Sequence, residues 1–266
     1  MSNQTQAAWS KPPLIKSPVL RYLVVAGVLV YIVTAVLSFG INPARIARGL
    51  GRAGEIFGAF LRPDFISRGP QIWEGVIESI AMTVGATAVG VLISIPLSLG
   101  AASNISPLPV YLLCRAFLVT IRSLHVVVLA ILFVIMLGFG PFAGALTLVL
   151  NSVGFIGKLL SEEIENIDDE SLEAVRATGA TWSQVVVFSV WPQVVTRVIG
   201  ISIYRMDINF RQSTVIGLVG AGGIGAVLDT AMGRYDYNTA AGILIVIIGL
   251  VLGGEYLSSA IRRRLT

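Results

Sequence analysis

The stretch that decides the fold reads Glu173-Ala-Val-Arg-Ala-Thr-Gly179-Ala-Thr-Trp-Ser-Gln184, and it lies in a polar segment between two long apolar runs. Acidic residues crowd into this stretch and the residues before it, at Glu162, Glu163, Glu165, Asp168, Asp169, Glu170 and Glu173. Residues 162–192 are therefore expected to form a polar loop that protrudes from the apolar body of the protein.

Local signals predict two short helices inside this loop. Asp168 is suited to cap the first helix, and Gly179 is suited to end it with a positive φ. Thr181 and Gln184 form a capping box that starts the second helix, and Pro192 suits the first turn of the apolar helix that follows. A helix, a glycine corner and a second helix make a rigid unit, which we call the elbow. The alternative is a solvated connector.

The composition of the whole chain is that of a membrane protein. Hydrophobic residues make up 55% of the 266 residues and charged residues only 13%, whereas charged residues are about a quarter of a soluble domain. The single cysteine excludes internal disulfides, and the single histidine excludes a histidine-paired metal site or a catalytic triad. The basic residues are dispersed, which gives no surface for nucleic acid. We expect transport rather than catalysis, and no metal site.

Apolar runs of helix length predict an all-α integral membrane protein with about six transmembrane helices. The spans are expected at about residues 22–40, 77–101, 112–137, 142–160, 194–218 and 240–260. The excess of Lys and Arg at one set of span ends favours two cytoplasmic termini in a multi-pass protein of the inner membrane. The basic residues between Arg45 and Arg68 count against that orientation.

The expected organisation has four parts. They are a cytoplasmic tail (1–20), a first span with an external connector (21–76), a core with the loop 162–192 (77–260) and a basic cytoplasmic tail (261–266). Within the connector, residues 42–60 carry apolar side chains at helical spacing and are expected to form an amphipathic helix at the membrane surface. The role of this Arg-rich segment stays open.

Glu173-Ala174, Gly179 and Pro192, at these separations, resemble the EAA loop in the membrane subunits of binding-protein-dependent ABC importers. The sequence departs from the family pattern at three flanking positions, Val175, Ser189 and Trp191. The resemblance implies a type I importer permease core of five spans from about residue 77 onward, with the first span as an addition. It also implies coupling to a separate cytoplasmic ATPase through Glu173, Ala174, Arg176, Gly179, Thr181 and Pro192.

A narrower resemblance follows from the stretch Tyr204-Arg205-Met-Asp207-Ile-Asn209-Phe-Arg211-Gln-Ser213-Thr214-Val-Ile-Gly217, which is similar to permeases of phosphonate and phosphite importers. Residues 138–144, 158–162 and 219–225 also resemble that group. The resemblance implies a homodimer that works by alternating access with two ABC ATPase subunits and an external solute-binding protein. ATP and Mg would bind the ATPase, so this chain would carry no cofactor and would not be an enzyme. A stand-alone secondary transporter or channel, and an ABC permease for another small solute such as an amino acid, stay open.

Charged residues inside the fifth apolar run are the candidates for the substrate pathway. At about 1.5 Å per residue from Pro192, Arg205 lies about 20 Å and Arg211 about 29 Å along the helix. Arg205 shares a face with Asn209, while Asp207 and Arg211 share another face and form a natural ion pair. A guanidinium fits tetrahedral oxyanions, so Arg205 is either an anion contact or a packed structural residue. Ser213 and Thr214 are further candidates, although such hydroxyls usually bond within or between helices.

The glycine-rich stretch Gly220, Gly222, Gly223 and Gly225 matches a dinucleotide-binding fingerprint. That fingerprint functions only between a strand and a helix of a soluble domain, whereas this stretch follows an apolar span. We therefore expect an external loop in which the glycines let the backbone turn back at the mouth of the pathway.

Overall fold

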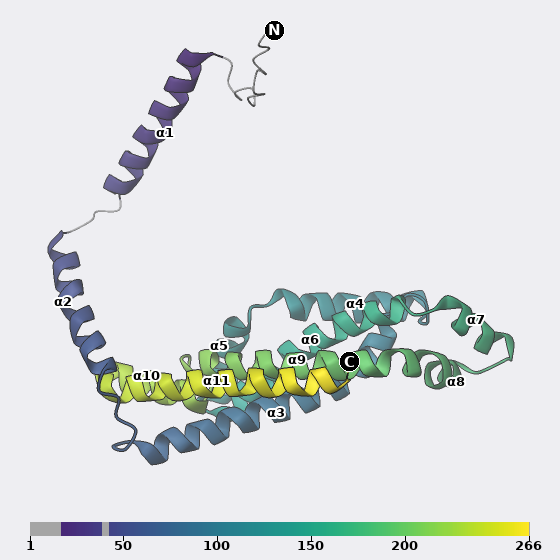
Figure 1. The fold of residues 1–266 in the computed structure, drawn as a ribbon. Coiled ribbons are helices and arrows are strands. Elements are labelled where there is room, and N and C mark those ends of the chain that lie inside the picture. The colour runs from purple at the N-terminus through teal and green to yellow at the C-terminus, as the bar shows by residue number, and fades with distance from the viewer. Residues whose placement is uncertain (1–16, 39–42, 266) are drawn as a thin grey trace, which may run out of the picture. The chain divides into compact units, whose positions relative to one another are not determined.

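The computed structural model describes residues 17–38 and 43–265, and in this part of the chain helices joined by short connections are present, without strands (Figure 1). The helices are α1 (Pro18–Ser38), α2 (Pro43–Phe60), α3 (Gly69–Gly100), α4 (Leu108–Ser123), α5 (Val126–Leu137), α6 (Pro141–Glu165), α7 (Asp169–Ala177), α8 (Trp182–Val185), the π-helix η1 (Val186–Val190), α9 (Trp191–Gly217), α10 (Gly223–Gly233) and α11 (Tyr237–Leu265). The predicted fold class is confirmed.

Five helical segments of the described residues are long and apolar enough to cross a membrane. They are Pro18–Ser38, Gly69–Gly100, Pro141–Glu165, Trp182–Gly217 and Tyr237–Ala260. A sixth span is possible only if α4 and α5 together form a broken one, because they meet at 91°. The number of spans therefore agrees with the six predicted from the sequence. One of the predicted spans has a different structure.

The third predicted span, residues 112–137, is divided between α4 and α5, which together form a broken helix. Leu124 and His125 both have extended backbones, which interrupts the helical hydrogen bonds between α4 and α5. His125 then caps α5, because its Nδ1 accepts a hydrogen bond from the N–H of Val127 at 3.3 Å. The polar residues in this part of the run mark the break, which apolar content alone does not reveal.

Three further boundaries differ from the sequence prediction. The second span starts at Gly69 rather than at residue 77, because Pro70 opens a helix that carries polar side chains outward beyond the apolar run. The fourth span continues to Glu165, and α11 continues to Leu265 through most of the expected tail. Residues 1–16 of the expected N-terminal tail lie outside the described residues, and α1 already begins at Pro18.

The chain divides into two compact units between Ile56 and Phe57. In the first unit, the apolar side chains of α1 are exposed around its circumference, as in a helix that meets lipid on all sides. The connector predicted at residues 42–60 is helical, as α2. Its location at a membrane surface stays a prediction.

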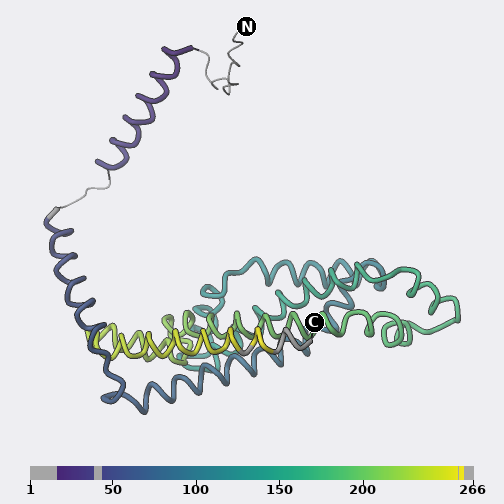
Figure 2. Tube along the Cα trace, in the orientation of Figure 1, coloured from purple at the N-terminus to yellow at the C-terminus, as the bar shows by residue number. Residues whose placement is uncertain are grey.

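In the second unit, α3 packs closely along α6, and α9 packs against both of them. Figure 1 shows α7 and α8 at one end of this bundle and α10 at the opposite end. The tube in Figure 2 follows the chain from α6 out to the elbow and back through α9. An apolar cluster beneath the elbow joins it to the bundle through Ile105, Ile164, Leu172, Val185 and Val194.

Pro192 lies in the first turn of α9, as predicted, but no break precedes this helix, because α8, η1 and α9 form one continuous helical segment. The N–H of Trp191 donates to the carbonyl of Val186, five residues earlier. Proline has no N–H, and its ring collides with the carbonyl four residues before it in an α-helix. The wider π turn makes room for Pro192 without a break, so the elbow and the span α9 are mechanically continuous.

Candidate functional site

The elbow has the predicted local structure. The carboxylate of Asp168 accepts hydrogen bonds from the N–H groups of Glu170 and Ser171 at 3.3 Å. Gly179 has a φ of 77°, which is strained for residues with a side chain. Thr181 and Gln184 form the capping box, in which the N–H of Thr181 donates to Gln184 Oε1 at 2.8 Å. The elbow is therefore a pair of capped helices with a fixed corner.

One face of the elbow is anchored and the other is exposed. Leu172 and Val185 are buried on the bundle side. All six predicted coupling residues are exposed, namely Glu173, Ala174, Arg176, Gly179, Thr181 and Pro192. Their placement leaves them accessible to a partner, and their role in coupling stays a prediction.

The elbow is tied to the α3–α4 connection, residues 101–107. Arg176 NH2 donates to the carbonyl of Asn104 at 2.8 Å, and Trp182 Nε1 donates to the carbonyl of Ile105 at 3.0 Å. From α6, the carbonyl of Ile164 accepts from Asn104 Nδ2 at 2.8 Å. The sequence did not reveal this tether, because its acceptors are backbone carbonyls more than 70 residues from the donors of the elbow.

An ion pair supports the same connection. Arg115 of α4 and Glu165 of α6 lie 3.0 Å apart, and Glu165 Oε1 also accepts from the N–H of Ser103 at 3.0 Å. Residues 101–107 are therefore bonded to the elbow, to α4 and to α6.

Arg205 lies inside the bundle, with 2% of its surface exposed. Its Nε donates to Ser152 Oγ at 3.0 Å, and its NH2 donates to Asn151 Oδ1 and Gln212 Oε1. The guanidinium also stacks 5.1 Å from the ring centre of Phe155. Of the two roles left open for Arg205, this placement favours the structural one, because neutral oxygens already accept from its Nε and NH2.

Asn209 shares this buried face, as predicted. Its Nδ2 donates to Thr87 Oγ1 and to Ser152 Oγ, both at 2.9 Å. The cluster joins α3, α6 and α9, so it holds together the three helices that pack most closely. Ser213 is also buried, and its hydroxyl bonds back to the carbonyl of Phe210 at 2.8 Å, which is the usual arrangement for such hydroxyls.

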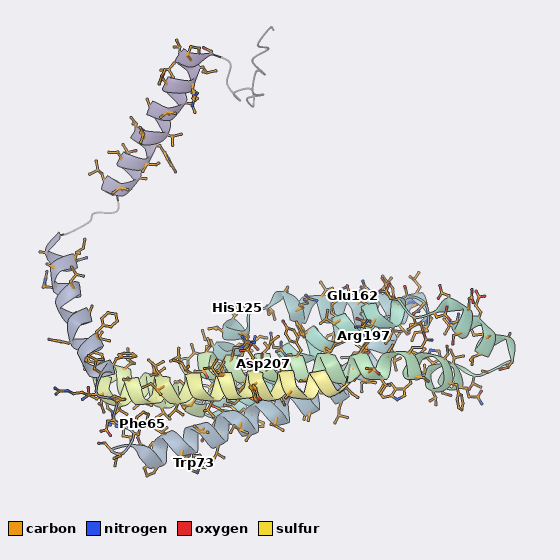
Figure 3. All side chains as sticks on the ribbon, in the orientation of Figure 1. Phe65, Trp73, His125, Glu162, Arg197 and Asp207 are labelled. Carbon is orange, nitrogen blue, oxygen red and sulfur yellow. The ribbon has the colours of Figure 1, made fainter. Side chains whose placement is uncertain are left out.

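The opposite face of α9 carries the predicted ion pair between Asp207 and Arg211. The side chain of Arg211 is 52% exposed and that of Asp207 is 10% exposed. Figure 3 labels Asp207 about midway along the bundle, with Glu162 and Arg197 nearer to the elbow. Asp207 lines a groove of about 330 Å³ between α3, α9 and α11. The Asp207–Arg211 face of α9 is therefore partly exposed, whereas the Arg205 face is buried.

The predicted external glycine loop is only partly a loop, and this prediction was wrong for two of its four residues. Gly220 and Gly222 lie in the turn after α9, whereas Gly223 begins α10 and Gly225 lies within it. A Cβ on Gly225 would lie 2.0 Å from the carbonyl oxygen of Thr214, so glycine lets α10 approach α9. The apolar spacing of residues 224–231 is the helix signal that the glycines concealed. The preceding element is a helix, which rules out the dinucleotide fingerprint.

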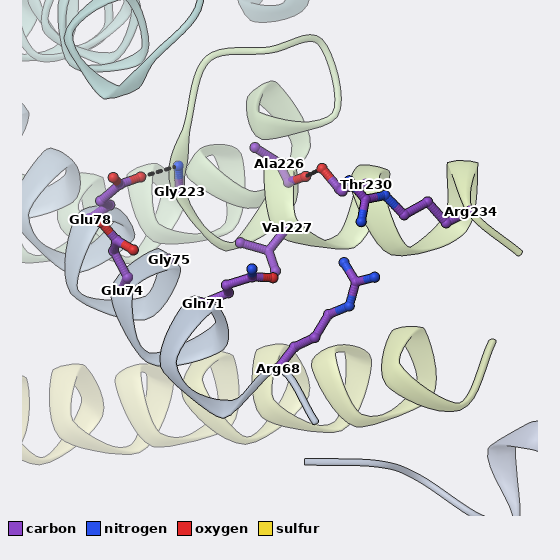
Figure 4. A pocket seen from close by; sticks show the side chains of 10 residues that line it. All are labelled: Arg68, Gln71, Glu74, Gly75, Glu78, Gly223, Ala226, Val227, Thr230 and Arg234. Atoms are coloured by element: carbon purple, nitrogen blue, oxygen red, sulfur yellow. Dashed lines mark hydrogen bonds between the residues drawn. The ribbon is translucent and has the colours of Figure 1, made fainter. Parts of the chain in front are cut away.

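A polar pocket of about 400 Å³ lies between α3 and α10, at the end of the bundle opposite the elbow (Figure 4). Its lining includes Arg68, Gln71, Glu74, Glu78, Thr230 and Arg234. Arg68 is held by Asp236 at 3.6 Å, and Glu78 is bonded to the backbone of α10. The sequence did not reveal this pocket, because the unexpected helix α10 forms one of its walls.

The chain is similar to several transport permeases. It is 37% identical over 242 residues to the phosphate-import permease protein PhnE of Mycolicibacterium smegmatis, a match that covers 90% of this chain and 46% of that protein. It is also 37% identical over 225 residues to the phosphite transport system permease protein PtxC of Stutzerimonas stutzeri, which covers 84% of this chain and 81% of that protein. The chain thus spans less than half of the mycobacterial protein and most of PtxC.

Solved structures share the fold. An inward-facing structure of the MetNI methionine ABC transporter matches with a TM-score of 0.63 at 24% identity, over 74% of this chain and 98% of that chain. An amino acid ABC transporter matches with a TM-score of 0.62 at 21% identity, over 76% of this chain and 98% of that chain. The family model for the inner membrane component of binding-protein-dependent transport systems matches residues 94–266. These similarities agree with the elbow and the bundle, and they show that the chain belongs to the family of binding-protein-dependent transport system inner membrane components.

Proposed function

We propose that this chain is the permease subunit of an ATP-driven importer for phosphonate or phosphite. The elbow is the observation that carries the proposal, because it is a rigid, partly exposed unit continuous with the span α9. The relative from Stutzerimonas stutzeri is named as a phosphite permease and the mycobacterial one as a phosphate-import permease. The ligands in these names are tetrahedral phosphorus oxyanions, and we assign the same class of substrate to this chain.

The proposed assembly contains two copies of this chain, two cytoplasmic ABC ATPase subunits and an external solute-binding protein. ATP and Mg bind the ATPase subunits, and this chain carries no cofactor. Both termini lie in the cytoplasm together with the elbow, and the polar pocket between α3 and α10 lies on the external side. The exposed face of Glu173, Ala174 and Gly179 is the proposed contact with the ATPase.

The proposed mechanism is alternating access. Closure of the ATPase dimer on ATP displaces the elbow, and two routes carry that displacement into the membrane. One route is direct, because α8, η1 and α9 are continuous. The other runs from Arg176 and Trp182 through residues 101–107 to α3 and α4. The spans thereby reorient as connected units around the substrate pathway.

Reconstitution tests the proposal. Proteoliposomes that contain the permease, its ATPase and its binding protein are expected to accumulate labelled phosphite or methylphosphonate only when ATP and the binding protein are both present. An ATPase variant that binds but does not hydrolyse ATP is the matched control. Uptake that persists with this variant would identify a stand-alone transporter or channel. Uptake of an amino acid instead of the phosphorus oxyanions would agree with an importer but would refute the proposed substrate.

A further inference from the structure

The helix α2 carries an exposed apolar face. Leu50 lies four residues after Ile46 and seven residues before Phe57, so the three side chains share one side of the helix. Each of them is more than half exposed. Large apolar side chains that are exposed together mark a surface that contacts a membrane or another protein. The apolar face of α2 is therefore a contact surface.

Three arginines lie on the other side of α2. Arg45, Arg48 and Arg52 are separated by three and four residues, so they also share a face. At about 100° per residue, the centre of this face is turned about 150° from the centre of the apolar one. All three arginines are exposed, and no ion pair of theirs is recorded among the described residues. Glu55 is the one acidic residue of the helix, so the arginine face is complementary to an anionic surface.

Chain connectivity keeps both ends of α2 close to the ends of membrane spans. As consecutive spans, α1 and α3 require the chain between them to begin and end at the same membrane face. The helix α2 begins five residues after Ser38, where the span α1 ends. It ends four residues before Asp64, whose N–H donates to the carbonyl of Asn238 at 3.0 Å, in the first turn of the span α11.

These links are too short for α2 to stand upright on the membrane. An extended chain covers at most about 3.6 Å per residue, so the two links reach about 18 Å and 14 Å. The helix has 18 residues and is about 27 Å long. If one end of α2 stayed at the surface, the other end of an upright helix would lie beyond the reach of its link. The helix therefore lies along the membrane face.

The two faces of α2 match the two layers of a membrane surface. A helix that lies on a membrane buries its apolar face about 5 to 10 Å into the boundary between headgroups and acyl chains. The opposite face then lies at the level of the headgroups, where a guanidinium can bond two oxygens of one phosphate. Each basic residue near a surface of anionic lipids strengthens binding about fivefold. The arginine face therefore favours lipids with a net negative charge.

We propose that α2 is a lipid anchor that selects anionic phospholipids. Its apolar face lies against the acyl chains, and Arg45, Arg48 and Arg52 bond the headgroup phosphates. This role accounts for the arginines that count against the predicted orientation, because basic residues are otherwise enriched on the cytoplasmic side of a membrane. In the proposed orientation α2 is external, and its arginines are retained there by the headgroups that they bind.

Fluorescence quenching by lipids tests the proposal. A bimane probe is attached to Ala53→Cys in a full-length chain whose single native cysteine is replaced by Cys114→Ser. Ala53 lies three residues after Leu50 and four before Phe57, which places the probe on the apolar side. The chain is reconstituted in vesicles of phosphatidylcholine and phosphatidylglycerol, and only one of the two lipids carries brominated acyl chains. Because bromine quenches at contact, the ratio of the two quenching efficiencies measures which lipid surrounds α2.

Phosphatidylglycerol is expected to quench the probe at least about threefold more efficiently than phosphatidylcholine. Replacing the three arginines together by glutamine (Arg45→Gln, Arg48→Gln and Arg52→Gln) is expected to lower this ratio to about one. Replacing the same residues by lysine is the matched control, which keeps the charge and is expected to keep most of the preference. Without any change to α2, salt at about 1 M is expected to lower the ratio by screening.

Three results would overturn the lipid anchor. Equal quenching by the two lipids at low salt would show that α2 does not select anionic lipids. A ratio that stays high in the glutamine variant would show that the arginines do not cause the preference. If neither lipid quenches the probe, α2 does not lie on the bilayer, and protection of the probe by added solute-binding protein would assign the face to that protein. The measurement involves no transport, so its outcome is independent of the proposed function.

Discussion

Glu78 of α3 accepts a hydrogen bond from the backbone N–H of Gly223, the first residue of α10, with 2.9 Å between Oε2 and N (Figure 4). The neighbouring Ser79 Oγ accepts from the N–H of Ile224, also at 2.9 Å. The first N–H groups of a helix lack partners within the helix and carry a partial positive charge. A carboxylate and a hydroxyl from α3 thus cap α10 from a distance of 145 residues in the chain.

Replacing Glu78 is expected to loosen α10. Glu78→Gln keeps an acceptor and loses the charge, which is expected to lower the free energy of unfolding by about 0.3 to 1 kcal/mol. Glu78→Ala also leaves the N–H of Gly223 without a partner, at a cost of about 1 to 3 kcal/mol. Thermal unfolding of the detergent-solubilised protein measures both changes. Glu74→Ala, in the same pocket but exposed, is the control, and an equal loss there would mean that the cap has no specific effect.

The corner of the elbow is expected to depend on glycine. Because Gly179 has a φ of 77°, Gly179→Ala is expected to cost about 1 kcal/mol, and Gly179→Pro cannot adopt this backbone at all. Both are expected to lower the number of substrate molecules imported per ATP hydrolysed, with proline the more severe. Paired measurements of uptake and hydrolysis give this ratio. Gly233→Ala, at a glycine with open space and no positive φ, is expected to leave it unchanged.

Sequence reasoning was most successful where local chemistry determines local structure. The cap at Asp168, the positive φ of Gly179 and the box between Thr181 and Gln184 each depend on residues within a few positions of one another. The Asp207–Arg211 ion pair was predictable for the same reason, because residues four apart lie on one face of a helix. The family resemblance followed from the same local stretches.

The failures came from interactions between distant segments. The partners of Arg205 on α6 and the tether of Trp182 to residues 101–107 require knowledge of which helices pack together. The helix α10 was missed because its glycines look like breakers, whereas they permit close packing on α9 and α3. The bend at His125 was missed because apolar content does not distinguish a straight span from a broken one.

The tether between the elbow and residues 101–107 is expected to contribute to coupling. Trp182→Phe keeps the ring and removes the indole N–H that donates to Ile105, a hydrogen bond worth about 1 kcal/mol. Arg176→Met keeps most of the side-chain length and removes the bond to Asn104. Each change is expected to reduce uptake severalfold while ATP hydrolysis continues. Trp191→Phe is the control, because no hydrogen bond of its indole is recorded in the described residues, and a matching loss there would refute the tether.

Substitution of the two arginines of α9 is expected to lower the free energy of unfolding by very different amounts. Removal of Arg205 takes away the donor to the partly buried Asn151 Oδ1 and one of the two donors to the buried Ser152 Oγ, and an acceptor left without a donor costs about 1 to 3 kcal/mol. Arg205→Ala is therefore expected to unfold the protein at a markedly lower temperature. Arg211→Ala, at a half-exposed side chain, is expected to change the free energy of unfolding by about 1 kcal/mol or less.

Uptake separates the roles of the two arginines further. Arg205→Lys keeps a charge but loses the planar fork, so it is expected to lose stability before it loses transport per folded molecule. The measurement is uptake normalised to the folded fraction, determined by size-exclusion chromatography of each variant. If Arg205→Lys were fully stable and inactive, Arg205 would act in transport itself, and the structural role would be wrong. A stable Arg211→Ala variant with little uptake would support the predicted place of Arg211 in the substrate pathway.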